Sequence, residues 1–242
     1  MAMPRISFLS SEEKERIHGQ SLDILQKVGI QFNSTRALKI LEEAGCQVDW
    51  DERSARFPPQ LVEQALRTLP SQFLMAARDP AHDFICGDGQ LYFTSSGQCP
   101  YFRDLETRVR RPATLDDLVT CARLTEAMDE VQEWCPMVLP SDVSPAMRAM
   151  RAMEVTLLHT TKHLLGGAEA RAEVPFVLEC IDAVLGDRAR LRERPIFTAI
   201  INPSSPLKNS GTLKDNILDF AAYRVPVFLQ FLPLAGATSP VT

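Results

Sequence analysis

PIFTAIIN, residues 195–202, decides the fold, because it is an apolar run without strict alternation of polar and apolar side chains. Similar runs occur at VQEWCPMVL (131–139), KHLLGG (162–167) and PVFLQFLPL (226–234). Helical stretches separate the four runs, near residues 145–160, 170–186 and 212–223. Continuous apolar strands that alternate with helices indicate a parallel sheet buried on both faces. The sequence therefore predicts an α/β fold from about residue 129 onward.

The chain before this sheet is predicted to be a separate extension of helices and hairpins. Ser10 with Glu13, and Thr114 with Asp117, have the spacing of capping boxes and predict the start of a helix. Short strand-like runs separated by turns fill residues 72–111.

Within residues 72–111, Gly87-Asp88-Gly89 is expected to close a hairpin, because no helix follows it as a phosphate-binding loop would require. We therefore expect two domains, an extension over residues 1–128 and the sheet domain over residues 129–242.

The last residues suggest that the pattern continues. Ser239 and Pro240 are typical of a helix N-cap and the first helical position. A parallel sheet of four strands ending at Leu232 would also leave a long apolar edge unpaired. We expect the first half of a (β/α)₈ barrel, with about four βα units present. The alternative is a complete, open, four-stranded α/β sheet.

Composition excludes several classes of function. A net charge of −5 argues against a nucleic-acid-binding surface. Arg108, Arg110 and Arg111 cluster, but acidic residues flank them, which predicts a salt-bridged face. The N-terminus lacks the apolar core of a signal peptide, and no run is long enough to span a membrane. The six cysteines form no Cys-x-x-Cys pair, so we expect reduced thiols in a cytoplasmic protein.

Two histidines, His159 and His163, have the i, i+4 spacing of a helical metal site. The helix is expected to end between them, which places His163 at the start of a strand and separates the pair. We therefore predict no metal site.

The carboxyl ends of the strands are better candidates, since barrel active sites form there. Asn202 ends one strand, and Gln230 lies in an apolar run, where a glutamine is either a satisfied interior amide or a ligand contact. Glu133 and Trp134 on the first strand are similarly ambiguous, with Trp134 favoured as a core residue.

Several separate motifs resemble one known family. DLETRVRRPATLDDL (104–118), ERPIFTAIINPSSPL (193–207) and PVFLQFLPLAGATSPVT (226–242) are similar to the trimethylamine methyltransferase family, whose superfamily includes glycine betaine:corrinoid methyltransferases. The opening IHGQSLDILQKVGIQF, with FPPQLVEQAL and AARDPAHDFICGDG, matches the usual start of its members. The resemblance covers essentially the whole chain.

The resemblance implies a TIM barrel with an N-terminal α/β extension. It also implies transfer of a methyl group from trimethylamine, or from a quaternary amine such as glycine betaine, to a Co(I) corrinoid on a partner protein. The chain itself would bind no cofactor tightly. Neither nucleic acid nor a membrane is expected as a further partner, and the chain could form a homo-oligomer. Trimethylamine enzymes of the family use a pyrrolysine in the later part of the barrel. The alternative is an incomplete, catalytically silent barrel that acts as a binding module.

The segment SSGQCPYFRD (95–104) would suit such a substrate. A quaternary ammonium has no N–H to donate, so aromatic faces hold it. Phe93, Tyr101 and Phe102 could form that cage, and Gln98 could meet a substrate carboxylate, with Asn202 and Gln230 completing the substrate site. Arg103 could neutralise the same carboxylate. The alternative is that these rings pack the extension onto the barrel.

Overall fold

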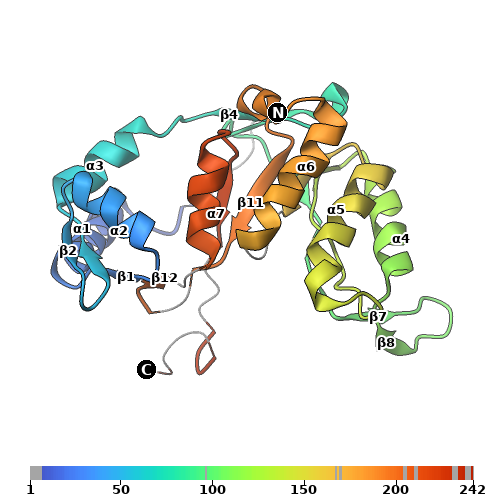
Figure 1. Ribbon diagram of the computed structural model, residues 1–242, viewed down its shortest axis with the longest axis horizontal. Coiled ribbons are helices and arrows are strands. Elements are labelled where there is room, and N and C mark those ends of the chain that lie inside the picture. The colour runs from blue at the N-terminus through green and yellow to red at the C-terminus, as the bar shows by residue number, and fades with distance from the viewer. Residues whose placement is uncertain are drawn as a thin grey trace. The chain divides into compact units, whose positions relative to one another are not determined.

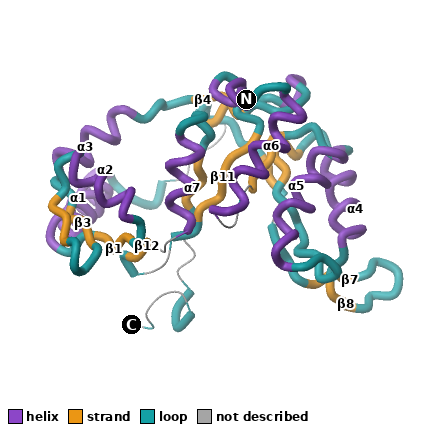
Figure 2. Tube along the Cα trace, viewed as in Figure 1, coloured by secondary structure: helices purple, strands orange, loops and turns teal. Residues whose placement is uncertain are grey.

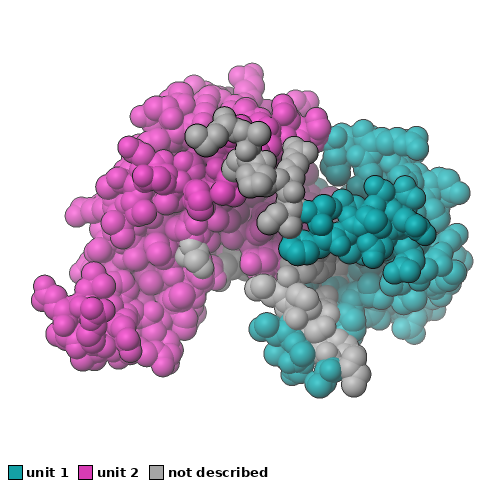
Figure 3. Space-filling model, turned by 180° about the vertical axis from the view of Figure 1, so that it is seen from behind, with its two compact units in different colours: residues 1–69, 203–211, 233–242 teal, residues 70–202, 212–232 magenta. Residues whose placement is uncertain are grey.

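The computed structural model describes residues 7–95, 97–166, 168, 171–203, 206–209, 212–230, 234–237 and 241. By its contacts the chain divides into two compact units, which Figure 3 colours separately. Unit 1 comprises residues 1–69, 203–211 and 233–242, and unit 2 comprises residues 70–202 and 212–232. This division groups residues that contact one another and does not test the domain boundary expected between residues 128 and 129, which stays a prediction. Ser239 and Pro240 lie outside the described residues.

Unit 1 is built from a small sheet with the strand order β12-β1-β3-β2. Its core is a cluster of Phe32, Leu38, Cys46 and Ala55. The helices are α1 (Ser11–Lys27), α2 (Thr35–Glu43) and α3 (Pro59–Thr68), and the strands are β1 (Ile30–Phe32), β2 (Gln47–Asp49), β3 (Ser54–Arg56) and β12 (Lys208–Asn209). The capping box of Ser10 and Glu13 is present at the start of α1, as predicted.

Unit 2 contains a parallel sheet of five strands in the order β13-β11-β10-β9-β6. These are β6 (Phe93–Thr94), β9 (Val131–Trp134), β10 (His163–Gly166), β11 (Phe197–Ile201) and β13 (Val227–Leu229). The helices α4 (Leu115–Glu126), α5 (Arg148–His159), α6 (Val174–Leu185) and α7 (Thr212–Ala221) connect successive strands, as the ribbon and tube views show (Figures 1 and 2). The predicted α/β fold with a parallel half-barrel sheet is confirmed.

The four predicted strands are present, and the structure adds β6 beside β9. The expected hairpin at Gly87-Asp88-Gly89 is wrong. The strand before it, β5 (Phe84–Cys86), pairs antiparallel with β4 (Phe73–Met75), whereas β6 joins the parallel sheet. The sequence misleads here because β6 is very short, so nothing in its pattern separates a hairpin partner from a parallel edge strand.

Side chains on the outer face of the sheet pack against the helices. Trp134 of β9 is fully buried and its Nε1 donates to Oγ1 of Thr156 on α5, 2.9 Å away. Phe197 of β11 packs edge to face on Phe220 of α7, with the ring centroids 5.3 Å apart. Trp134 is thus a core residue, as predicted. Fully buried rings of this size contribute several kcal/mol each to stability.

The hairpin of β4 and β5, with the short 3₁₀ helix η1 (Pro80–His82) between its strands, is fixed to the amino ends of the parallel strands. Arg194 forms two hydrogen bonds of 2.9 Å with the carboxylate of Asp83. The backbone N–H of Arg78 donates to the carbonyl of Thr161, just before β10. Because both contacts lie at strand starts, the hairpin covers this end of the sheet.

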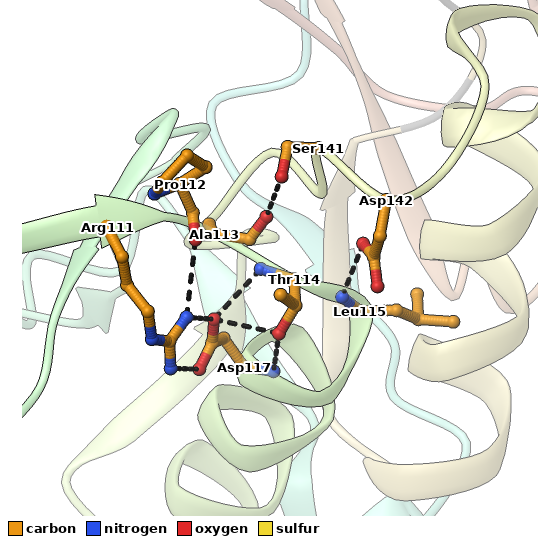
Figure 4. A network of polar contacts seen from close by, with 8 residues as sticks. All are labelled: Arg111, Pro112, Ala113, Thr114, Leu115, Asp117, Ser141 and Asp142. Carbon is orange, nitrogen blue, oxygen red and sulfur yellow. Dashed lines mark hydrogen bonds and ion pairs between the residues drawn. The ribbon is translucent and has the colours of Figure 1, made fainter.

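The motif at residues 104–118 folds as a second hairpin, β7 (Tyr101–Arg103) with β8 (Arg110–Pro112), followed by the capped start of α4 (Figure 4). Arg111 donates to both carboxylate oxygens of Asp117, at 2.6 and 2.8 Å. Asp117 also accepts from the backbone and hydroxyl of Thr114, which completes the predicted capping box. The hydrogen bonds from Arg111 lower the pKa of Asp117 to about 2.

The loop after β9 is held against the same helix start. Both the backbone N–H and the hydroxyl of Ser141 donate to the carbonyl of Ala113, and Asp142 accepts from the N–H of Leu115 (Figure 4). Asp142 thereby satisfies one of the backbone donors that a helix N-terminus leaves free. The remaining 3₁₀ helices of unit 2 are η2 (Pro145–Met147), η3 (Arg171–Glu173) and η4 (Arg188–Arg192).

Candidate functional site

Unit 2 has a cavity of about 990 Å³ on the inner face of the parallel sheet. Each of the five strands, or the residues directly after it, contributes to the wall, including Gln98, Pro136, Gly166, Asn202 and Gln230. The carboxyl ends of the strands therefore converge on one space, which is where barrel enzymes place their active sites. Its volume is at the upper end of the range of about 300–1,000 Å³ for small-molecule sites.

Alternation along the strands selects the side chains that face the cavity. Glu133 of β9 and Cys135 directly after it line the cavity, while Trp134 between them packs outward. Thr198 and Ile200 of β11, and Asn202 directly after it, also line the cavity. Successive side chains of a strand point to opposite faces, so a sheet covered by helices on one side presents every second residue to a ligand on the other.

Aromatic rings form a large part of the cavity wall. They are Phe73, Phe84, Tyr92, Phe93 and Phe228. The rings of Phe84 and Tyr92 lie 4.7 Å apart, and the Tyr92 hydroxyl donates to Asp88 over 2.6 Å. The hydrogen bond to Asp88 and the contact with Phe84 hold the Tyr92 ring in position. A wall of this kind suits a ligand that carries methyl groups on a cationic nitrogen.

Ser95, Gln98 and Cys99, which follow β6 in the chain, contact the residues directly after β9. The hydroxyl of Ser95 bridges the backbone N–H and C=O of Cys135, at 2.8 Å each. The backbone N–H groups of Gln98 and Cys99 donate to the carbonyls of Pro136 and Met137. These bonds bring Gln98 to the cavity wall.

Position 97 requires glycine, because a side chain there has no room. A Cβ at this position would lie 2.7 Å from the sulfur of Cys135, a separation shorter than van der Waals contact allows. The close approach of the segment to β9 therefore depends on a residue without a side chain.

Glu133 is the acidic residue of the cavity wall among the described residues. Burial raises the pKa of its carboxyl group, and a hydrogen bond from Thr94 lowers it in part. Burial, together with the charge of Glu133, raises the pKa of the neighbouring Cys135 thiol to about 11. At neutral pH the thiol is therefore protonated, and Cys135 acts as a small apolar wall residue rather than a nucleophile.

His163 lies behind the wall and has both ring nitrogens occupied. Nδ1 is 2.7 Å from the carbonyl of Ala76, and Nε2 is 2.9 Å from Oγ1 of Thr198. Burial lowers the pKa of His163 to about 4, so the ring is neutral at physiological pH. His159 ends α5 and His163 begins β10, as the sequence predicted for this pair. The described residues contain no group of three or more His, Cys, Asp or Glu side chains placed to hold a metal ion.

The structure brings together four of the six residues expected to bind substrate. Phe93, Gln98, Asn202 and Gln230 line the cavity. Tyr101 and Phe102 on β7 are not in the wall. Arg110 lies over the ring of Tyr101, 3.8 Å from its centroid, and Phe102 packs against the core with Arg111 over its ring. The three rings proposed as a cage are thus not gathered around one space. Ser204 and Ser205, which follow Asn202, lie outside the described residues.

The wall residues that sequence reasoning missed include Phe84, Tyr92 and Arg148. Phe84 and Tyr92 precede the parallel strands, and nothing in their pattern shows that the β4–β5 hairpin covers the end of the sheet. Arg148 starts α5, directly after the loop that follows β9. The rule that barrel sites are built from such loops was the available signal.

Comparison with known proteins identifies the family. The model of the family described as "Trimethylamine methyltransferase (MTTB)" matches residues 1–242. The chain belongs to this family. The family is one of corrinoid-dependent amine methyltransferases.

Two curated relatives show how far the similarity extends. A trimethylamine methyltransferase MttB from Desulfitobacterium hafniense (strain DSM 10664 / DCB-2) is 32% identical over 233 residues, which is 96% of this chain and 47% of that protein. A glycine betaine methyltransferase from D. hafniense (strain Y51) is 24% identical over 241 residues, 99% of this chain and 50% of that protein. The chain thus spans about half the length of the curated relatives it matches.

A solved structure supports the fold independently. The crystal structure of the hydroxylamine MtmB complex superimposes with a TM-score of 0.51 at 11% sequence identity, covering 92% of this chain and 50% of that one. At this identity the likeness concerns the fold alone. Among the described residues, none of the helices combines the length and apolar character needed to cross a bilayer.

Proposed function

We propose that this chain binds a methylated amine in the cavity of unit 2 and takes part in the transfer of one of its methyl groups to the corrinoid of a partner protein. The substrate is trimethylamine or a quaternary amine, and the setting is cytoplasmic. The observation that carries the proposal is the wall itself, which combines five aromatic rings with the carboxyl group of Glu133 on the inner face of the parallel sheet.

The rings and the acid suit an N-methylated cation. A methylated ammonium offers few or no N–H groups, so it is held by aromatic faces, each worth about 0.5–2 kcal/mol. Glu133 adds a negative charge where water is partly excluded, and electrostatic attraction is stronger there than in bulk water. Gln98, Asn202 and Gln230 can orient the rest of the substrate through neutral hydrogen bonds.

The cavity, of about 990 Å³, is larger than a small amine fills and leaves space beside a bound substrate. A Co(I) corrinoid on a partner protein would supply the nucleophilic electron pair for the new bond to the methyl carbon. The residues of this chain hold the substrate in line and exclude water around the methyl group. When the carbon–nitrogen bond breaks, its electrons stay on nitrogen, so a quaternary ammonium leaves as a neutral amine without a proton donor. A neutral tertiary amine would need activation first.

The test is methylation of a Co(I) corrinoid by the protein, followed by the loss of Co(I) absorbance, with glycine betaine, other betaines and trimethylamine as donors. We expect transfer from at least one donor. Absence of transfer from all of them, together with tight binding of a methylated amine, would favour the alternative of a binding module. Absence of both would overturn the proposal.

A further inference from the structure

The connection between β6 and α4 contains the β7–β8 hairpin, which projects from the body of unit 2 (Figure 1). A connection of this kind follows the carboxyl end of its strand, the end of the sheet where barrel active sites lie. Backbone hydrogen bonds join Cys99, two residues before β7, to Met137 and Leu139, and Leu139 lines the cavity. The hairpin therefore begins directly beside the cavity wall.

The two faces of the hairpin have different surroundings. Phe102 pairs with Arg111 on the face that packs against the hydrophobic core and the start of α4. On the other face Arg103 lies directly opposite Arg110, and both side chains are exposed. Tyr101 shares this face, and the guanidinium of Arg110 lies over its ring. Like charges directly opposite each other on one face of a strand pair are destabilising.

No acid of the hairpin neutralises this pair. The carboxylate of Asp104 accepts hydrogen bonds from the backbone N–H groups of Glu106 and Thr107 and from the Thr107 hydroxyl, so it is engaged within its own turn. Among the residues that the structure describes, three arginines of the hairpin form no ion pair: Arg103, Arg108 and Arg110. The salt-bridged face expected for this cluster therefore forms only at Arg111, which pairs with Asp117 of α4.

The loop of the hairpin adds exposed apolar side chains. Leu105 is 77% exposed and Val109 is 58% exposed. Arginine and aromatic side chains are enriched at protein–protein interfaces, and tyrosine and arginine often dominate the binding energy there. A projecting hairpin that combines an exposed tyrosine, unpaired arginines and apolar side chains has the composition of a contact surface for another protein.

We propose that this surface docks the protein that carries the corrinoid, through an acidic patch of that partner. The docking face consists of Tyr101, Arg103 and Arg110, with Leu105 and Val109 in the loop. The inference rests on the proposed function, which requires a methyl acceptor carried on another protein to reach the cavity. Carboxylates of the partner would offset the repulsion between Arg103 and Arg110 and match the planar edges of both guanidinium groups. Complementary charges would also accelerate the encounter of the two proteins.

Two methyl acceptors test the proposal. Free cob(I)alamin reaches the cavity without a carrier, whereas a corrinoid protein reduced to Co(I) has to dock first. Arg110→Glu reverses one charge of the docking face and places a glutamate opposite Arg103, which keeps the strand pair stable. We expect the KM for the corrinoid protein to rise about tenfold. Transfer to free cob(I)alamin should stay unchanged, because Arg110 does not line the cavity.

The matched control is Arg123→Glu. Arg123 is also an exposed arginine, but it lies in the last turn of α4, at the opposite end of this helix from the hairpin. This variant makes the same change in net charge and should leave the KM for the corrinoid protein unchanged. Higher ionic strength should weaken transfer to the corrinoid protein more in the wild type than in Arg110→Glu, because salt screens the attraction between exposed charges.

The outcomes separate the docking proposal from the proposed function. An unchanged KM for the corrinoid protein in a folded Arg110→Glu variant would overturn the docking proposal and leave the proposed function intact, because methyl transfer would still be observed. An unchanged KM together with an altered oligomeric state, measured by analytical ultracentrifugation, would assign the face to contact between copies of this chain and likewise overturn the docking proposal. No transfer to either acceptor from any donor would overturn the proposed function.

Discussion

Asp117 and Glu133 are both partly or fully buried acids of unit 2, and their surroundings shift their pKa values in opposite directions. Asp117 sits in a closed network at the start of α4, where Arg111 and Thr114 hold its pKa at about 2 (Figure 4). Glu133 faces the cavity, where burial raises the pKa of its carboxyl group. The first acid stabilises the fold when ionised, and the second costs stability when ionised. A protein retains such a cost where a ligand supplies the missing charge.

The largest expected effect follows from breaking the closed network. Asp117→Asn removes the ion pair with Arg111 and weakens the cap of α4. We expect the free energy of unfolding to fall by about 2 kcal/mol at pH 7, measured by urea denaturation. Because the pKa of Asp117 is lowered from 3.8 to about 2, its contribution is complete above pH 3.8 and is lost as the pH falls through 2. The difference between variant and wild type should therefore shrink in acid, and a constant difference would contradict this account.

The second prediction has the opposite sign for stability. Glu133→Gln removes a buried carboxylate, so the variant should unfold at higher urea concentration at pH 7. The raised pKa means that ionisation of Glu133 costs stability progressively as the pH rises above 4.5. The same variant should bind tetramethylammonium about tenfold more weakly, which is about 1.4 kcal/mol.

The pH dependence of tetramethylammonium binding shows whether the charge of Glu133, rather than the shape of its side chain, contributes to affinity. Affinity of the wild type should rise with pH as Glu133 ionises, and affinity of Glu133→Gln should stay flat. Of the other groups on the wall, Cys135, with a pKa of about 11, and Tyr92, whose pKa is raised by its hydrogen bond to Asp88, stay neutral. A variant that binds as tightly as the wild type at pH 7 would show that the acid does not face the ligand.

The smallest effect concerns two exposed rings from the same stretch of sequence. Phe93 lines the cavity and is 54% exposed, whereas Tyr101 is 48% exposed and lies under Arg110. Phe93→Leu should weaken tetramethylammonium binding about fivefold, which corresponds to about 1 kcal/mol for one lost cation–π contact. Tyr101→Leu should leave binding unchanged and serves as the matched control, since both changes remove an exposed ring of a short strand. If only Tyr101→Leu weakened binding, the aromatic cage would have to be assigned to β7 instead.

Sequence by itself determined the local elements and much of the architecture. The capping boxes at Ser10 and Thr114, the four apolar strands and the outward Trp134 follow from spacing, periodicity and helix-end chemistry, which act over a few residues. The family motifs also lie within continuous stretches, and they predicted the parallel half-barrel that the structure shows.

Tertiary structure alone decided which strands pair and which side chains face the cavity. β6 joins β9 through hydrogen bonds across many intervening residues, and β12 pairs with β1 from the far end of the chain. The same is true of the cavity, which collects Phe84 from a hairpin, Glu133 from a strand and Arg148 from a helix start. Whether an arginine is paired, or a carboxyl group is held above or below its ordinary pKa, depends on such distant neighbours and on burial. No pattern within a short window of sequence carries that information, because solvation and pairing are properties of the folded chain.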